Sequence, residues 1–151
     1  MTDGISTGQI RAKVICIFRD GTRILVGDAF DPAKNELFYC PPGGGIKFGE
    51  SSEEALRREI REELETEIEN PWLLGVLENI FTYDGKRGHE IVFVYDAQFV
   101  KRSLYNVDQF TGCESNGEFF NASWLDIDSI GPQTPPVYPD GLLDLLKKEL
   151  A

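Results

Sequence analysis

The sequence is poor in the side chains that most often bind zinc or form catalytic triads. Its 151 residues include one histidine, His89, and three cysteines, Cys16, Cys40 and Cys113, which lie far apart in the chain. Because no Cys-x-x-Cys pair and no Cys/His cluster occurs, the sequence excludes the usual zinc-site patterns. A single histidine without a nucleophile motif also disfavours a Ser/His/Asp hydrolase. Scattered thiols are typical of a reducing compartment, so we expect a cytoplasmic protein.

Long apolar runs are missing as well. Runs such as residues 91–95 are far shorter than the roughly 20 apolar residues that a membrane-spanning helix needs. Residues 1–9 hold no cationic segment followed by an apolar one. We therefore expect no secretory signal, no membrane association and a loose N-terminal segment over residues 1–9.

Positive charge is scarce. The chain has 15 lysines and arginines against 26 aspartates and glutamates, which gives a net charge of −11. Such a chain lacks the basic surface that grips a nucleic-acid backbone, so we expect no long nucleic acid as a partner. A phosphate-bearing small molecule is compatible with this charge if a cation mediates its binding, and a divalent metal ion is the obvious mediator.

The hydrophobic pattern predicts one globular domain over residues 1–151, since 41% of the residues are hydrophobic. Alternating or apolar runs predict strands at 10–18, 24–26, 37–40, 72–83, 90–100 and 119–125. Helical periodicity predicts helices from 52 to at least 64 and from 140 to 150. Between them we expect a turn at 84–88, a polar loop at 104–117 and a proline-rich connector at 132–139.

A glycine-rich segment leads into the first predicted helix. Gly43-Gly44-Gly45 forms regular structure only at a cost, which indicates a backbone made for close approach to another group. Ser51 then has the features of a helix N-cap, with Glu54 three positions on as its capping-box partner. A glycine-rich loop that ends in a helix N-terminus can offer backbone groups to phosphate.

Three glutamates share one side of that helix. Glu59, Glu62 and Glu63 stand at positions i, i+3 and i+4, beside the apolar stripe that includes Leu56 and Ile60. A solvated charged face would show the same spacing, but this cluster borders the buried stripe and follows the glycines. Oxygen ligands suit Mg²⁺ or Mn²⁺. A metal that bridges the carboxylates and a diphosphate would neutralise both and activate water.

The spacing of these residues resembles a known family motif. Gly44, Glu50 and the run at 58–63, Arg-Glu-Ile-Arg-Glu-Glu, are similar to the Nudix box G-x5-E-x7-R-E-U-x-E-E-x-G-U, where U is aliphatic. The match covers residues 44–66 and departs from the pattern at Glu65 and Thr66, where the family has glycine and an aliphatic residue. The resemblance to the Nudix hydrolase family (MutT-like) implies an α/β/α sandwich with a mixed β-sheet between helices.

The resemblance also implies residue roles. Glu59, Glu62 and Glu63 would hold Mg²⁺ or Mn²⁺, with the Gly43 backbone carbonyl as a further ligand. One glutamate would act as the general base, with Glu59 and Glu62 as the catalytic candidates. The structural members of the box would be Gly44, Glu50 and Arg58, the last two forming an ion pair.

Residues outside the box give weaker signals. Family members often recruit a further metal-binding carboxylate from a late loop, and here the candidates are Glu114 and Glu118. For each of them, ordinary surface exposure is the alternative. Substrate-binding candidates, which core packing or a solvated turn would also explain, are Phe81, Tyr83, Lys86, Arg87 and His89.

Together these features predict a metal-dependent pyrophosphohydrolase. Water would attack phosphorus in the diphosphate linkage of a nucleoside diphosphate joined to another moiety: a nucleotide, an NDP-sugar, ADP-ribose or a dinucleoside polyphosphate. The partner is a nucleotide-type small molecule, and a homodimer is possible. One alternative is a non-catalytic module of the same fold that senses a nucleotide. Another is an acidic calcium-binding or protein-interaction domain.

The departure at Glu65 carries its own prediction. Glycine normally lets the chain leave a helix through a left-handed turn, and a residue with a Cβ does so at a cost. Residues 64–68 contain no helix breaker, and Asn70-Pro71 is the first hard stop. We therefore expect the helix to continue by about a turn beyond Glu65. The rival outcome is a left-handed exit at Glu65.

Overall fold

The computed structural model describes residues 8–150, so most of the N-terminal segment expected to be loose lies outside the described residues. The elements in chain order are β1 (Ile10–Ile17), β2 (Arg19–Asp20), β3 (Arg23–Asp31), β4 (Glu36–Cys40), β5 (Gly43–Gly45), α1 (Ser52–Leu64), β6 (Ile68–Tyr83), β7 (Lys86–Phe99), η1 (Arg102–Asn106), β8 (Gln109–Cys113), β9 (Phe119–Asp126), η2 (Ile127–Ser129) and α2 (Leu142–Glu149). Within this described range no helix is both long and apolar enough to cross a membrane.

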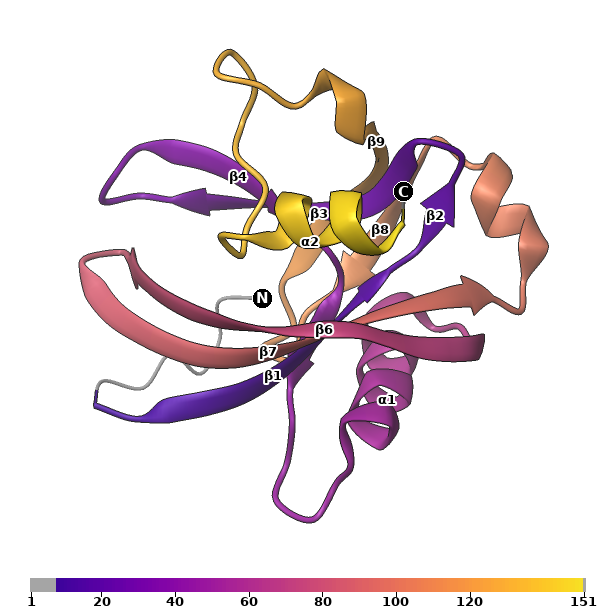
Figure 1. The fold of residues 1–151 in the computed structure, drawn as a ribbon, viewed down its shortest axis with the longest axis horizontal. Helices are drawn as coiled ribbons and strands as arrows, with labels where there is room; N and C mark the ends of the chain where they lie inside the picture. The colour runs from indigo at the N-terminus through magenta and orange to yellow at the C-terminus, as the bar shows by residue number, and fades with distance from the viewer. Residues whose placement is uncertain (1–7, 151) are drawn as a thin grey trace.

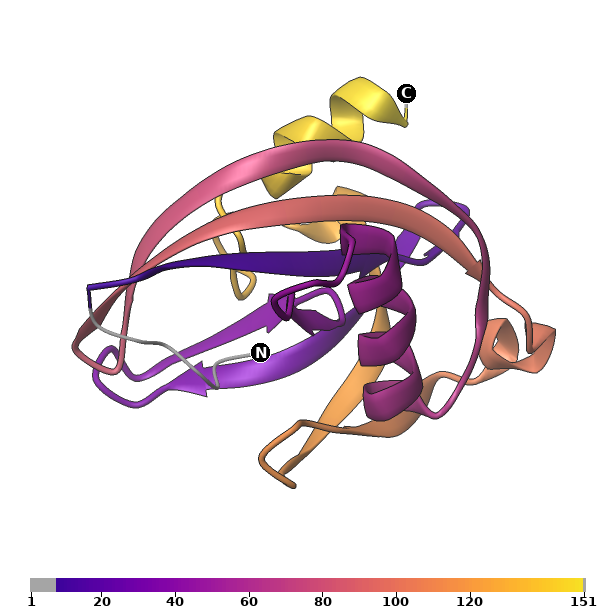
Figure 2. The same ribbon diagram turned by 90° about the horizontal axis from the view of Figure 1, so that it is seen from below.

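The strands form two sheets. One has the order β5-β1-β7-β6 and is mixed, because β1 runs parallel to β7 while its other neighbours are antiparallel. The second has the order β2-β3-β9-β8, with β4 paired to β3. Figures 1 and 2 show α1 and α2 on opposite sides of the mixed sheet. The chain thus has the predicted α/β/α architecture with a mixed sheet between helices.

Strand β1 is apolar on both faces because each face meets a different core. Val14 and Cys16 pack in the cluster that contains Leu56 and Ile60 of α1. The alternate residues, beginning with Ile15, pack in a second cluster with α2. A central strand covered on both sides needs apolar residues at successive positions, which is the pattern read in the sequence. This double burial fixes α1 against β1 and so positions its glutamates.

The start of α1 follows its local sequence. The Ser51 hydroxyl accepts a hydrogen bond from the Glu54 backbone N–H at 3.1 Å, and the Glu54 carboxylate accepts one from the Ser51 N–H at 3.4 Å. Both halves of the predicted capping box are therefore present. The helix begins at Ser52, as expected.

The end of α1 contradicts the expected extension. Glu65 has φ 53° and ψ 40°, the left-handed conformation, and its N–H bonds to the Arg61 carbonyl at 3.0 Å. The helix stops at Leu64, because Ile68 pairs with Phe99 at the start of β6 and is only 4% exposed. Strand pairing and the burial of Ile68 outweigh the roughly 1 kcal/mol that a Cβ costs in this conformation.

Asn70-Pro71 is likewise not a stop but part of a strand. Strand β6 starts at Ile68, four residues before its predicted start, and its register with β7 shifts between Glu69 and Trp72. Asn70 has φ 54° at this bulge. A proline is tolerated at a bulge because no ladder hydrogen bond is required of it there.

The left-handed exit leads to a stability prediction. Replacing Glu65, which is exposed, by glycine removes the Cβ strain and should raise the free energy of unfolding by about 0.5–1 kcal/mol, after the greater freedom of the unfolded chain is subtracted. Urea denaturation measures this change. Glu65→Ala is the matched control, since it keeps the Cβ and should give no such gain. Equal stability of the two variants would contradict the strain.

Two other expectations about local structure were wrong. Gly43–Gly45 is a short regular strand, β5, paired antiparallel with β1. The predicted polar loop at 104–117 includes the last three residues of η1 and the whole of β8, which pairs with β9. Gly112 of β8 leaves room for the Phe120 ring, since a Cβ there would lie 2.2 Å from that ring. Pairing stabilises both segments: β5 pairs with the distant strand β1, and β8 forms a hairpin with β9, the next strand along the chain.

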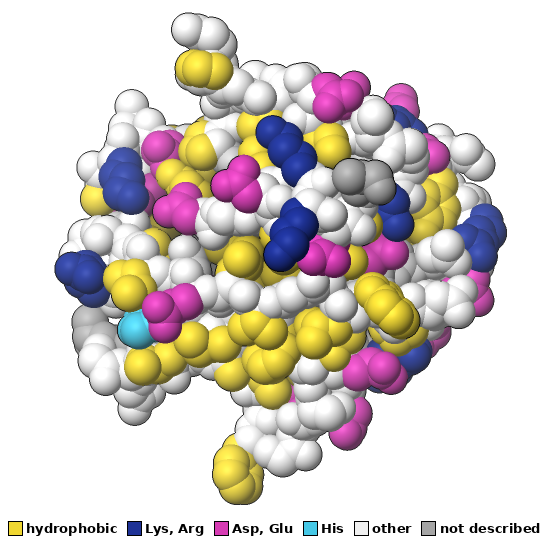
Figure 3. Space-filling view, viewed as in Figure 1, with side chains coloured by type: hydrophobic (Ala, Val, Ile, Leu, Met, Phe, Trp, Pro, Cys, Tyr) yellow, Lys and Arg dark blue, Asp and Glu magenta, His cyan; other side chains and the backbone are white. Residues whose placement is uncertain are grey.

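Strand β6 forms one edge of its sheet and carries a band of apolar side chains that faces outward (Figure 3). Trp72, Val76 and Ile80 are 70%, 50% and 51% exposed. An edge strand of this kind can pair with another chain. A homodimer stays a prediction, and the exposed apolar residues of β6 form the surface at which two copies would meet.

Candidate functional site

The glutamates of α1 differ in their surroundings. Glu59 and Glu63 are buried, with exposures of 9% and 4%, while the side chain of Glu62 is 47% exposed. All three lie next to Ile60, which is fully buried, so helical periodicity places them at the edge of the core as expected. Two carboxylates are thus held in the protein and the third opens to solvent.

The glycines of β5 provide the space for the two buried carboxylates. A Cβ on Gly44 would lie 2.4 Å from the Glu59 carboxyl carbon, so only glycine lets this carboxylate lie against the strand. The Gly43 N–H donates a hydrogen bond of 2.9 Å to Glu63 Oε1. The close approach expected of the glycine segment is therefore an approach to the helix carboxylates.

Arg58 connects the box residues. Its Nε and Nη2 donate to the two oxygens of Glu50 at 2.6 and 2.8 Å. Nη2 also donates to the Gly45 carbonyl at 2.9 Å. Nη1 donates to Glu59 Oε1 at 2.8 Å and to Glu62 Oε2 at 3.2 Å. This guanidinium ties the loop to the helix and brings the carboxylates of Glu59 and Glu62 to one shared point.

The surroundings of Glu50 and Glu63 shift the pKa values of the two carboxyl groups in opposite directions. The hydrogen bonds from Arg58 lower the pKa of Glu50 to about 2, so Glu50 is a permanent anion that holds the loop. Burial raises the pKa of Glu63 to about 8, and the negative charge of Glu59 adds to the effect. For Glu63, burial therefore outweighs the nearby positive charge of Lys13 and disfavours the ionised carboxylate.

These residues fit a divalent cation by their chemistry. The donors are carboxylate oxygens, which Mg²⁺ and Mn²⁺ prefer, and two of them already meet at Arg58 Nη1. Within residues 8–150, no three acidic, histidine or cysteine side chains converge as a ready-made ion site. The reason is visible in the contacts: Arg58 lies between Glu59 and Glu62, and Glu63 bonds to Gly43.

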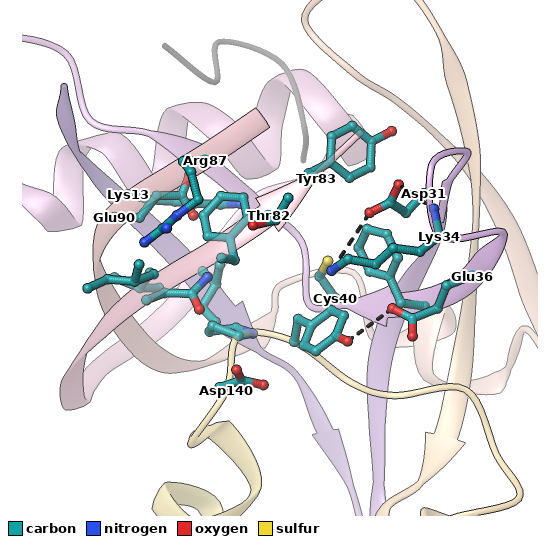
Figure 4. Close-up of a pocket in the computed structure, with 18 residues that line it drawn as sticks. Lys13, Asp31, Lys34, Glu36, Cys40, Thr82, Tyr83, Arg87, Glu90 and Asp140 are labelled. Carbon is teal, nitrogen blue, oxygen red and sulfur yellow. Dashed lines mark hydrogen bonds and ion pairs between the residues drawn. The ribbon is translucent and has the colours of Figure 1, made fainter. Parts of the chain in front are cut away.

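A cavity of about 420 Å³ lies between the two sheets. Figure 4 shows Glu90 and Arg87 on one side of it and Glu36 on the other. Its aromatic lining consists of Phe38, Phe81, Tyr83 and Tyr138, and its polar lining includes Lys13, Asn79 and Glu90. The charge of Lys13 lowers the pKa of Glu63, opposing the larger effect of burial, so this cavity residue lies near the α1 carboxylates.

The structure brings together only some of the substrate-binding candidates. Phe81, Tyr83 and Arg87 line the cavity, whereas Lys86 and His89 are not among its lining residues. The His89 Nε2 lies 3.5 Å from Glu78 Oε2.

The two candidate late-loop carboxylates occupy the turn between β8 and β9. The Glu114 N–H donates to the Glu118 carbonyl at 2.8 Å. Glu114 is half-buried and Glu118 is exposed. A metal-binding role for either one stays a prediction.

Sequence reasoning missed several polar residues of the cavity, among them Lys13, Asn79 and Glu90. They are only 8%, 9% and 5% exposed. Each interrupts or borders an apolar run of a strand, and a buried polar residue in such a run is a recognisable signal. Their meeting depends on strand register, which places Asn79 opposite Glu90 and Lys13 opposite Val92.

Comparisons with known proteins show the family of the chain. A sequence profile described as the NUDIX domain matches residues 9–143. The nucleoside triphosphatase NudI of Escherichia coli O139:H28 is 39% identical over 89 residues, which cover 54% of this chain and 62% of that protein. The chain therefore spans less than two thirds of the length of the curated relatives it matches.

Solved structures share the fold. A MutT NUDIX hydrolase from Burkholderia pseudomallei has a TM-score of 0.65 and 23% identity, covering 95% of this chain and 99% of that chain. An ADP-ribose pyrophosphatase from Streptococcus suis has a TM-score of 0.58 and 13% identity, covering 91% of this chain and 87% of that chain. Identities at this level concern the fold alone.

Proposed function

The chain belongs to the NUDIX domain family, and on this premise we propose that it is a metal-dependent pyrophosphohydrolase. Its substrate is a nucleoside diphosphate joined to another group. The observation that carries the proposal is the placement of Glu59 and Glu63 against the glycine strand β5. Lys13, whose charge lowers the pKa of Glu63, lines a cavity of about 420 Å³.

The residues that would hold the metal are Glu59, Glu62 and Glu63, with the Gly43 carbonyl as a further candidate. When bound, a divalent ion supplies the positive charge that lets a diphosphate approach this acidic chain and favours ionisation of water. Arg58 keeps Glu59 and Glu62 adjacent through its shared Nη1. Lys13 and Arg87 add positive charge along the cavity.

Glu62 is the better placed general base of the two catalytic candidates. Its side chain is 47% exposed, against 12% for Glu59, so water reaches it from solvent. Glu62 would accept the proton of the attacking water at a carboxylate oxygen while Arg58 holds the other candidate in place. The water oxygen bonds to one phosphorus, the bridging P–O bond breaks, and both halves leave as phosphates.

The location and partners of the enzyme follow as proposals. Cys16, Cys40 and Cys113 are free thiols in the described structure, which supports a reducing compartment such as the cytoplasm. The partner is a nucleotide-type small molecule.

A nucleotide sensor of the same fold is the second candidate. It is favoured by Arg58, whose Nη1 occupies the point where Glu59 and Glu62 meet and so supplies a cation without metal. Turnover decides between the two functions, since a sensor binds the nucleotide and leaves it intact.

The test is a substrate panel with Mg²⁺ or Mn²⁺, comprising NDP-sugars, ADP-ribose, dinucleoside polyphosphates and (d)NTPs, with products separated by ion-exchange chromatography. We expect at least one compound to yield a nucleoside monophosphate and a phosphorylated remainder. If panel members bind but none of them is cleaved, the chain is a nucleotide sensor and the proposed hydrolase activity is wrong.

A further inference from the structure

Asn79 is a buried polar side chain that the fold does not use. It lies on β6, is only 9% exposed and lines the cavity. Its carboxamide makes no hydrogen bond with any residue between 8 and 150, the range that the structure describes. A carboxamide offers two donors and an acceptor oxygen, and those of Asn79 are not among the enclosed unpaired polar atoms of the described residues, so they are open to the cavity. A ligand in the cavity would satisfy these groups.

Glu90 stands beside Asn79 on the same face of the sheet. The two residues are directly opposite each other across β6 and β7, and both line the cavity. Glu90 is 5% exposed, and its Oε2 lies 3.7 Å from Arg11 Nη1. Residues opposite each other in an antiparallel pair have neighbouring side chains. The cavity floor thus presents a donor and acceptor beside a carboxylate.

The distance from this floor to the α1 carboxylates suits a nucleoside. The sheet order is β5-β1-β7-β6, so Asn79 lies three strand spacings from the glycines that contact Glu59 and Glu63. At about 4.8 Å per spacing the sideways separation is roughly 14 Å. Glu90, which is opposite Asn79, pairs with Arg11, whereas Gly44 pairs with Val14, so the two places are also offset by about three residues, or roughly 10 Å, along the strands. A nucleoside diphosphate that spans about 17 Å would place its base at β6 and its phosphates at β5.

Aromatic side chains complete a surface for a planar ring. The Phe38 ring lies 5.3 Å from the Tyr138 ring and 6.2 Å from the Tyr83 ring. The Tyr138 hydroxyl donates to Glu36 at 3.0 Å, which fixes that ring at the cavity wall. Aromatic rings favour contact with other flat rings.

We propose that Asn79 is the specificity-determining residue of the substrate site, where its carboxamide and the neighbouring Glu90 carboxylate hydrogen-bond the edge of the nucleobase. The inference rests on the proposed function in one respect, that the diphosphate lies at the α1 carboxylates. The ligand class is a nucleotide whose base has an N–H donor beside an acceptor. A sugar phosphate without a base lacks this edge.

Equilibrium binding tests the proposal without turnover, because nucleoside monophosphates have no diphosphate linkage to cleave. Isothermal titration calorimetry with Mg²⁺ present measures the dissociation constants of AMP, GMP, CMP, UMP and ribose 5-phosphate. We expect at least one nucleotide to bind the unmodified protein more tightly than ribose 5-phosphate. Asn79→Leu should raise the dissociation constant of that nucleotide by about tenfold or more and leave the dissociation constant of ribose 5-phosphate unchanged. Asn106→Leu, on the exposed helix η1, is the matched control and should change neither.

Thermal unfolding of Asn79→Leu separates recognition from a structural role. Because the amide has no partner in the described fold, its replacement should leave the melting temperature at or above that of the unmodified protein. The inference is overturned if no nucleotide binds more tightly than ribose 5-phosphate. It is also overturned if Asn79→Leu binds all five compounds as before, or weakens ribose 5-phosphate equally.

The outcomes also distinguish this inference from the proposed function. Selective loss of nucleotide binding in Asn79→Leu, with no cleavage of any compound in the panel, supports the base site and contradicts the hydrolase. Cleavage with unchanged base preference in Asn79→Leu supports the hydrolase and contradicts the role of Asn79.

Discussion

Glu62→Gln and Glu63→Gln should each lower kcat by about 100-fold or more, because removing a negative charge from the metal site removes several kcal/mol of transition-state stabilisation. Glutamine preserves the size of both side chains. In Glu63→Gln the amide oxygen can still accept the hydrogen bond from the Gly43 N–H. In Glu62→Gln the side chain remains largely in solvent. Steady-state kinetics with the substrate found in the panel measures the effect.

Stability should not fall with activity in these variants. The carboxylates on successive turns repel one another, so neutralising one relieves repulsion within α1. Glu53→Gln is the matched control, since Glu53 lies on the exposed side of the same helix, 3.4 Å from Arg57. The kcat of Glu53→Gln should equal that of the unmodified protein. Near-normal kcat in both Glu62→Gln and Glu63→Gln would show that the assignment of the metal ligands is wrong.

The parts of the site that could be predicted from the sequence depend on short-range geometry. The capping box spans only four residues, from Ser51 to Glu54, and it fixes the residue at which α1 begins. Helical periodicity then brings Glu59, Glu62 and Glu63 to one side. Local spacing of this kind is set by the backbone of a single helix, so no tertiary information is needed.

The parts that could not be predicted depend on pairing between distant segments. Leu64 to Ile68 reads as a continuing helix, and only the pairing of Ile68 with Phe99 ends it at Glu65. Gly43–Gly45 becomes a strand because β1 supplies its hydrogen-bonding partners. A propensity scale does not contain these partners, and tertiary pairing overrides it.

The cavity shows the same limit at the level of single residues. Asn79 and Glu90 meet because the β6–β7 register places them opposite each other. A one-residue shift would turn one of the two to the other face of the sheet. The bulge between Glu69 and Trp72 is part of that register, and nothing in the alternation of residues 72–83 indicates its place.

Removal of divalent metal should abolish hydrolysis altogether. The chain carries a net charge of −11, and the buried carboxylates of Glu59 and Glu63 would repel a diphosphate. Arg58 contacts Glu59, but its guanidinium is already shared among Glu50, Glu59, Glu62 and Gly45. The charge of Lys13 lowers the pKa of Glu63 without outweighing burial, so we expect a metal ion to supply the charge between carboxylate and phosphate.

The rate of diphosphate cleavage in three conditions tests the central claim most directly: with Mg²⁺, with excess EDTA, and with EDTA followed by an excess of Mg²⁺ or Mn²⁺. Chromatographic separation of the nucleoside monophosphate product gives the rate in each. We predict full turnover in the first, none above the uncatalysed rate in the second and recovery in the third. Undiminished turnover in excess EDTA would contradict a metal-dependent reaction at Glu59, Glu62 and Glu63.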